Sequence, residues 1–134
     1  MAGVVNVRAA LETALNAMSP ALPTSFENVA FVPVAGTAYQ QVNVLFAKPD
    51  NREFGNRHQE LGYMQIKLCY PLQLGTSTIA ARAELIRATF KRGNTFASSG
   101  VTVMVTDTPE VSAVGVEGDR YAMPVKIRFV AQIN

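Results

Sequence analysis

Cysteine, histidine and charged residues are all scarce in this chain of 134 residues. The single cysteine excludes an internal disulfide framework and any cysteine-rich zinc site, and the single histidine excludes metal sites built from several histidines. Charged residues make up 16% of the chain, against about 25% in an average soluble domain. A surface with so few charges leads us to expect that partners cover much of it.

The charge balance and the apolar runs exclude further classes of protein. A net charge of +2 lacks the strongly basic face of a nucleic-acid binder. The first eleven residues have no apolar core and contain Arg8, which argues against a secretory signal. The longest uncharged run, residues 28–47, is broken by proline, glycine and amides and does not predict a membrane span. We expect one soluble domain, residues 1–134, made in a reducing cytoplasm.

Two segments have the spacing of amphipathic helices. The first has Asn6 as its expected N-cap and an apolar face formed by Val7, Leu11, Leu15 and Met18. The second opens at residues 75–77, with Thr76 or Ser77 as its cap, and runs to about Lys91 before Gly93. Its buried stripe should consist of Ile79, Ala83, Ile86 and Phe90.

Alternation of apolar and polar residues predicts four strands, at 39–48, 62–70, 101–106 and 121–133. The polar connection over 49–60 should be long and mobile. The order α-β-β-α-β-β predicts an α+β fold of two layers. We expect a mainly antiparallel sheet of four to five strands, with both helices packed on one face.

The inward positions of these elements give an expected core of Ile66, Leu68, Ile86, Val103 and Ile127. Pro124 cannot donate to a ladder, so the last strand should begin at a sheet edge or a bulge. Alternation places Cys69 on the outward face beside Lys67, whose ammonium could lower the pKa of the thiol. A buried or interface cysteine that acts as a small apolar residue is the more ordinary alternative.

Residues suited to catalysis or to metal binding do not form a recognisable constellation. His58, the only histidine, falls in the connection 49–60, where a general base would be poorly held. Three acids between residues 110 and 119 lack the alternating pattern of a calcium loop, and no glycine-rich phosphate loop is present. We therefore predict a protein that is not an enzyme and has no catalytic residue, metal or cofactor.

Opposite charges gather in two neighbouring parts of the sequence. The second helix is basic at its end, with Leu85 on the side away from its buried stripe, and the loop that follows is acidic. The candidate interface residues are Arg82, Leu85, Arg87 and Arg92 on the helix and Asp107, Glu110, Glu117 and Asp119 in the loop. Either set can be an ordinary solvated face, but together they suit a head-to-tail contact between copies, which can close into a ring.

The sheet face without helices is a second candidate surface. Partner contact and open solvent both fit this face, because its only charges are basic. Its expected members are Gln41, Asn43, Leu45, Tyr63, Gln65, Lys67, Thr102, Met104, Lys126 and Arg128.

Short motifs follow the amphipathic first helix in a distinctive order. They are Phe26-Glu27-Asn28-Val29-Ala30-Phe31, then Gly55-Asn56-Arg57-His58 ahead of Gly62 and Met64-Gln65-Ile66, then Tyr70-Pro71 with Gly75-Thr76. With the second helix, this order resembles a bacteriophage-related family of small proteins similar to the tail terminator, or tail completion, proteins of long-tailed phages. The resemblance covers nearly the whole chain.

The resemblance implies an assembly role without catalysis. Six copies would form a ring on the head-proximal end of the tail tube, stop tube polymerisation and present a surface to head-completion proteins. The expected partners are a second copy, the tail tube protein and a head-completion protein, with no specific nucleic acid and no membrane. Arg57 and His58 match the family pattern in position, which suggests an interaction role. The protein would occupy the host cytoplasm during assembly and then the virion tail.

Two alternatives remain open from the sequence. One is another head–tail connector component, which would form its ring on a different partner. The other is a small monomeric binding module or enzyme on the same α+β layers, because a fold does not determine a function. The mass in solution, with and without tube protein, distinguishes them.

Overall fold

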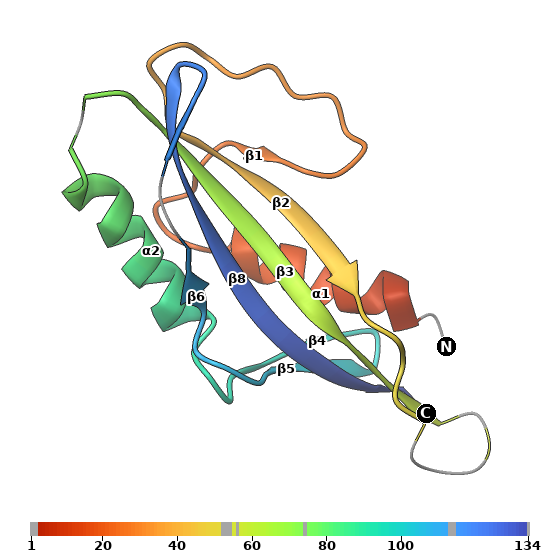
Figure 1. The fold of residues 1–134 in the computed structure, drawn as a ribbon. Coiled ribbons are helices and arrows are strands. Elements are labelled where there is room, and N and C mark those ends of the chain that lie inside the picture. The colour runs from red at the N-terminus through yellow and green to blue at the C-terminus, as the bar shows by residue number, and fades with distance from the viewer. Residues whose placement is uncertain (1–2, 52–54, 56, 74, 113–114, 134) are drawn as a thin grey trace.

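The computed structural model describes residues 3–51, 55, 57–73, 75–112 and 115–133. The described chain has an α+β fold in which the strands form a curled sheet and the helices pack against it (Figure 1). Its elements are α1 (Gly3–Asn16), β1 (Thr24–Ser25), β2 (Tyr39–Phe46), β3 (His58–Pro71), α2 (Ser77–Thr89), β4 (Thr95–Ser98), β5 (Val101–Val105), β6 (Glu110–Val111), β7 (Gly115–Glu117) and β8 (Arg120–Ile133).

The sheet has eight strands within the described residues, in the order β1-β2-β3-β8-β5-β4, and β6 and β7 also pair with β8. β1 runs parallel to β2, so the sheet is mixed. The α+β class is confirmed, but the predicted sheet of four to five antiparallel strands is too small. The additional strands β1, β4, β6 and β7 have only two to four residues each, which is too short for alternation to predict them.

The length of β8 explains why so many short strands are needed. One edge of this 14-residue strand pairs with β3 along its whole length. Its other edge pairs in turn with β7, β6 and β5, from its beginning to its end. The segment between β5 and β8 therefore closes an edge that would otherwise expose unpaired backbone groups.

The predicted core is confirmed. All five of its residues are fully buried, and both helices contribute to the same apolar cluster on one side of the sheet. Figure 1 shows α1 crossing behind β2 and β3 and α2 running beside β8. The predicted stripe is buried: Ile79, Ala83 and Ile86 lie on α2, and Phe90 is its C-cap.

Several predicted boundaries differ from the structure. The first helix begins at Gly3, so Asn6 lies inside it and is not its cap. Thr76 is the N-cap of α2, but its side chain makes no capping hydrogen bond. β3 begins at His58, and reciprocal main-chain bonds of 2.9–3.0 Å join Asp50 to Gln59. The predicted connection 49–60 is therefore shorter than expected, while Phe54 and Asn56 lie outside the described residues.

Gly62 allows an unusually close approach of β3 to β2. A Cβ atom built on Gly62 would lie 2.0 Å from the main-chain oxygen of Leu45, far inside contact distance. Only glycine fits this position without a shift of the backbone. The contact lies where β2 ends, opposite Phe46 in the register.

Pro124 lies inside β8, four residues after the strand begins at Arg120. Arg120 pairs with β3 on one side and β7 on the other, so the expected start at a sheet edge is wrong. The main-chain N–H of Ser112 donates to the oxygen of Pro124. Because the N and O of one strand residue point to the same side, the missing N–H of Pro124 faces away from β3. The proline therefore costs no hydrogen bond of the β3–β8 ladder.

Cys69 lies on the sheet face opposite the main core, as alternation predicts, yet it is only 3% exposed. It pairs with Tyr39 of β2 and Ala122 of β8, in a covered part of that face. Burial raises the pKa of the thiol despite the nearby Tyr39 hydroxyl and Lys67 ammonium, which act in the other direction. Of the two interpretations that the sequence left open, the buried cysteine that acts as a small apolar residue is the one the structure confirms.

Candidate functional site

The cations predicted to form a basic patch on α2 have different environments. Arg82 is only 5% exposed, and its guanidinium donates to the main-chain oxygen of Pro20. The expectation that Arg82 lies on an exposed face is therefore wrong, because it joins α2 to the segment after α1. Arg87 donates a 3.0 Å hydrogen bond from Nε to the oxygen of Pro109, whereas Arg92 is exposed.

Leu85 is also misplaced by the sequence prediction. It is half-buried and packs against the core, although it was expected on the far side of the helix. Consecutive helical residues are separated by about 100°, so Leu85 flanks Ile86 at the border of the buried stripe. It contributes to the stability of this chain and presents only part of its surface to a partner.

Each acid of the predicted acidic loop lies beside a cation of the same chain. The pairs are Asp107 with Arg128 (3.8 Å), Glu117 with Lys67 (2.9 Å), Asp119 with Arg120 (3.8 Å) and, opposite each other in the β6–β8 register, Glu110 with Lys126. The contact of Arg87 with Pro109 places the basic helix next to this loop. The two patches are thus neighbours within one copy.

Arg57 and His58 lie at the start of β3. His58 is the first residue of that strand rather than part of a mobile loop, and its Nε2 lies 3.0 Å from Oε1 of Glu60. Glu60 is itself buried. Arg57 is exposed immediately before the strand, and Asn56 lies outside the described residues.

The predicted open face of the sheet is confirmed by the strand register. Rows across β2, β3 and β8 place its members on one side, for example Leu45, Tyr63 and Arg128. The ammonium of Lys126 lies 4.5 Å from the centroid of the Tyr63 ring. Leu45 and Met104 are both exposed at the same end of this face.

A groove of about 690 Å³ lies at that end of the sheet, and we call it the sheet-end groove. Apolar side chains and main chain form most of its wall, with single charged groups at its border. Its lining residues are Ala47, Asp50, Gln59, Leu61, Gly62, Tyr63, Thr106, Arg128, Phe129 and Val130.

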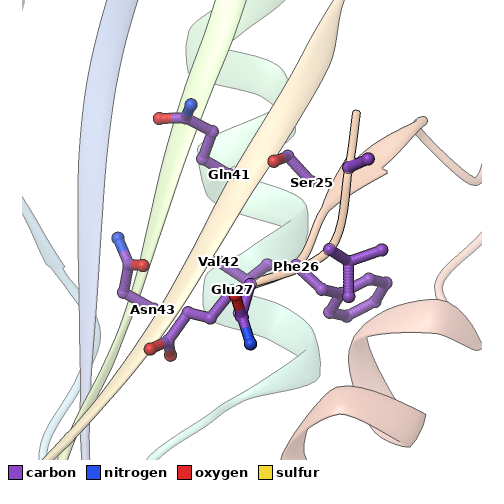
Figure 2. A pocket seen from close by; sticks show the side chains of 9 residues that line it. Ser25, Phe26, Glu27, Gln41, Val42 and Asn43 are labelled. Atoms are coloured by element: carbon purple, nitrogen blue, oxygen red, sulfur yellow. The ribbon is translucent and has the colours of Figure 1, made fainter. Parts of the chain in front are cut away.

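The outer edge of β2 is closed by an ion pair. Arg8 and Glu27 lie 2.9 Å apart, and both also bind the main chain of Val44. Glu27 accepts a 2.6 Å hydrogen bond from the N–H of Val44, and Arg8 donates a 3.1 Å bond to its oxygen. Figure 2 shows Glu27 extending from the segment after β1 toward β2. The two side chains thus replace a neighbouring strand beyond Ser25.

Electrostatics support this arrangement. Burial by itself would raise the pKa of Glu27, but the hydrogen bonds from Arg8 and Val44 outweigh it and hold the pKa below its ordinary value. The carboxylate is therefore charged at neutral pH. A shallow pocket lies between this segment and β2 and is lined by residues 25–30 and 41–43 (Figure 2). The edge of β2 that the ion pair closes forms one wall of this pocket.

The opposite end of the sheet carries an anchored loop that the sequence analysis did not identify. Arg120 is 5% exposed and donates hydrogen bonds to the main-chain oxygens of Thr37 and Val34. Its guanidinium lies 5.1 Å from the centroid of the Tyr39 ring, which contacts Phe31 at 5.3 Å. We call residues 29–36 of this loop the valine loop, because its three valines are exposed.

One sequence signal could have identified this loop. It falls within the uncharged run 28–47, which we considered only as a possible membrane span. An uncharged, proline-containing segment that lies outside the strands exposes apolar side chains and marks a candidate contact surface. In the structure, no helix of the described chain is long and apolar enough to cross a bilayer.

Candidate metal ligands do not cluster in the part of the chain that the structure describes. No group of three or more histidine, cysteine, aspartate or glutamate side chains could hold a metal ion there. The described features with functional character are surfaces: the sheet-end groove, the closed edge of β2 and the valine loop.

Comparisons with known proteins identify the fold and the family of this chain. A solved protein structure, whose name states no function, shares the fold with a TM-score of 0.78 at 24% sequence identity, over 96% of this chain and 94% of that one. No curated protein matches the chain significantly in sequence. The sequence profile of the phage tail terminator proteins matches residues 6–129. The chain therefore belongs to the phage tail terminator protein family, whose members are structural proteins of the virion tail.

Proposed function

We propose that this protein forms a ring on the head-proximal end of the phage tail tube. There it stops tube polymerisation and offers head-completion proteins a surface for joining head to tail. The observation that carries the proposal is the family match, which spans residues 6–129 and therefore both helices and almost the whole sheet. A ring of six copies, assembled in the host cytoplasm, follows from the family resemblance.

The surface chemistry supports an assembly role. The curled sheet leaves one face largely free of helices. Because the chain has few charged residues, this face binds water only weakly. Exposed apolar side chains lie at both ends of the sheet, in the valine loop and around the sheet-end groove. A small protein with such surfaces is suited to contacts with neighbours on more than one side.

Charged groups would set the register between copies more than the strength of binding. Arg87 and Arg92 on α2 approach Asp107 and Glu110 of a neighbouring copy in this proposal, and Arg57 with His58 contacts another component of the tail. Exposed ion pairs contribute only about 0–1 kcal/mol each. Burial of apolar area must therefore supply most of the affinity.

Polymerisation of tail tube protein tests the proposal. Tubes grown with a molar excess of this protein should have a short and narrow length distribution in electron micrographs, because capped ends do not elongate. Tubes grown with the heat-unfolded protein provide the control. An unchanged length distribution would contradict termination, and binding to a head connector in place of tubes would favour the alternative connector role.

A further inference from the structure

Exposed apolar side chains are concentrated at one end of the sheet. Val32 and Val34 of the valine loop are 85% and 65% exposed. Val29, at 62%, lies farther along, beside α1 and residues 41–43 of β2. Val116 of β7 is 65% exposed at the same end, where β7 pairs with the first residues of β8. Figure 1 shows the connection between β1 and β2 beside the β7–β8 turn. Such a concentration costs solubility in a free monomer and marks a binding surface.

The valine loop is held in place before any partner binds. Arg120 anchors it at two main-chain oxygens, those of Val34 and Thr37, and the contact between Phe31 and Tyr39 packs its first half. A buried arginine loses hydration, and charge-assisted hydrogen bonds to main-chain oxygens offset that loss and hold the loop in one shape. A loop that is already ordered loses less conformational entropy on binding.

The sheet-end groove lies at the other end of the same strands. It is formed where β3 begins and β8 ends, at Leu61, Tyr63 and Val130, whereas the valine loop meets β8 at its first residue, Arg120. The groove volume of about 690 Å³ has room for a few side chains of the size of valine. The valine loop is uncharged, so it buries no unpaired charge in this apolar groove.

We propose that the valine loop of one copy inserts into the sheet-end groove of the next copy. The inference rests on the ring of the proposed function and names the surfaces that form it. A loop and a groove at opposite ends of one chain make a head-to-tail contact, which closes into a ring when the rotation between copies allows. The charged patches contribute less to the contact between copies than the valine loop does, because their acids already have cations beside them in the same chain.

Single substitutions of the exposed valines test the loop. Val32→Asp and Val34→Asp should leave the melting temperature almost unchanged and raise the dissociation constant between copies by about tenfold or more, because each places a charge in an apolar groove. Val5→Asp is the matched control, since Val5 on α1 is as exposed as Val34, at 65% each. It should assemble like the wild-type protein.

A mixing experiment tests the direction of the contact. Gln59→Trp, or Leu61→Asp if the first variant fails to fold, should block the groove and leave the protein monomeric while the valine loop is intact. Mixed with Val32→Asp, it should form one-to-one heterodimers and nothing larger in native mass spectrometry, because only one loop and one groove remain active. The wild-type protein provides the contrast with an isologous contact, which would stop at dimers and form nothing larger.

The outcomes separate this inference from the proposed function. If wild-type rings cap tubes and the valine variants cap them equally well, the loop-and-groove contact is wrong while termination stands. If the variants form normal rings but no longer bind tubes, the valine loop binds the tube protein, which also overturns the inference. If the wild-type protein neither forms rings nor caps tubes at any concentration, both proposals fail.

Discussion

The guanidinium of Arg120 donates a 2.7 Å hydrogen bond to the main-chain oxygen of Val34, which lies 86 residues earlier in the chain. Arg82 makes a similar contact with Pro20, across 62 residues. Both arginines are 5% exposed. Each one fixes a connecting segment that has little strand pairing of its own, and their charges are used for structure and not for an exposed patch.

Loss of the Arg120 anchor should loosen the valine loop. Arg120→Met removes the guanidinium hydrogen bonds to the oxygens of Val34 and Thr37, and Val34 keeps only the 3.1 Å bond from the N–H of Thr37. The free energy of unfolding should therefore fall by about 1–3 kcal/mol. Amide exchange over residues 31–38 should accelerate while the central strands stay protected. Arg128→Met, at an exposed cation, is the control and should change neither measurement. Unchanged exchange in the loop would show that Arg120 does not hold it.

Gly62 and Gly115 give a matched pair of glycine substitutions. Gly62→Ala forces a Cβ against the oxygen of Leu45, and a shift of the backbone should cost about 2–4 kcal/mol in urea denaturation. A Cβ on Gly115 meets no heavy atom within 4 Å, so Gly115→Ala should be nearly neutral. Equal effects of the two substitutions would contradict the close approach of β2 and β3.

The long elements could be predicted from the sequence because their patterns are strong. Alternation over β3 identified Met64, Ile66 and Leu68 as buried, and all three are fully inaccessible. Helical spacing likewise identified the stripe of α2. These patterns reflect which side of an element meets the core, which a single sequence records directly.

The surface could be predicted less well, because it depends on contacts between distant segments. Nothing near Arg82 in the sequence indicates that Pro20 will bind it, and the short strands that cover β8 have no period to detect. Cys69 shows the same limit: alternation gave its face correctly, but not what covers that face. The valine loop was missed since its anchor, Arg120, comes much later in the chain.

Burial of Cys69 predicts an unreactive thiol and a cost for a polar replacement. Cys69→Ser should destabilise the protein by about 1 kcal/mol, because it buries a more polar group at a position where the oxygen of Lys67 can accept from it. Cys69→Ala should cost less than Cys69→Ser if polarity is the cause. Alkylation of the wild-type thiol should be slow at neutral pH and accelerate with unfolding, since burial also raises its pKa. Rapid alkylation of the folded protein would contradict the covered position.

The edge of β2 should be sensitive to acid. The pKa of Glu27 is lower in the folded state than its ordinary value of 4.5, so the unfolded state binds the proton more readily. The stabilisation is present above that value and is lost as the pH falls through and below it. In denaturation at pH 3 to 7, Glu27→Gln should show a smaller loss of stability with acid. Identical pH profiles for the two proteins would contradict the ion pair as the cause.

Charge reversal on α2 should affect assembly more than folding. Arg87→Glu loses a part-buried hydrogen bond to Pro109 and the ion pair with Glu84, and should reduce the free energy of unfolding by about 1–2 kcal/mol. If Arg87 faces an acid of the next copy, ring formation should slow, and Glu110→Lys should restore part of the rate. Light scattering at low and high salt measures this, because salt screens such pairs beyond about 8 Å at physiological strength. Equal rates of ring formation for the wild-type protein, the two single variants and the double variant would show that these charges only bind water.

Cryo-electron microscopy of tail tubes grown with this protein tests the central claim most directly. We expect a closed ring of this protein on one end of each tube, with the valine loop of each copy in the sheet-end groove of its neighbour. Bare tube ends, or copies bound along the tube wall, would contradict the assignment of this protein as the terminator.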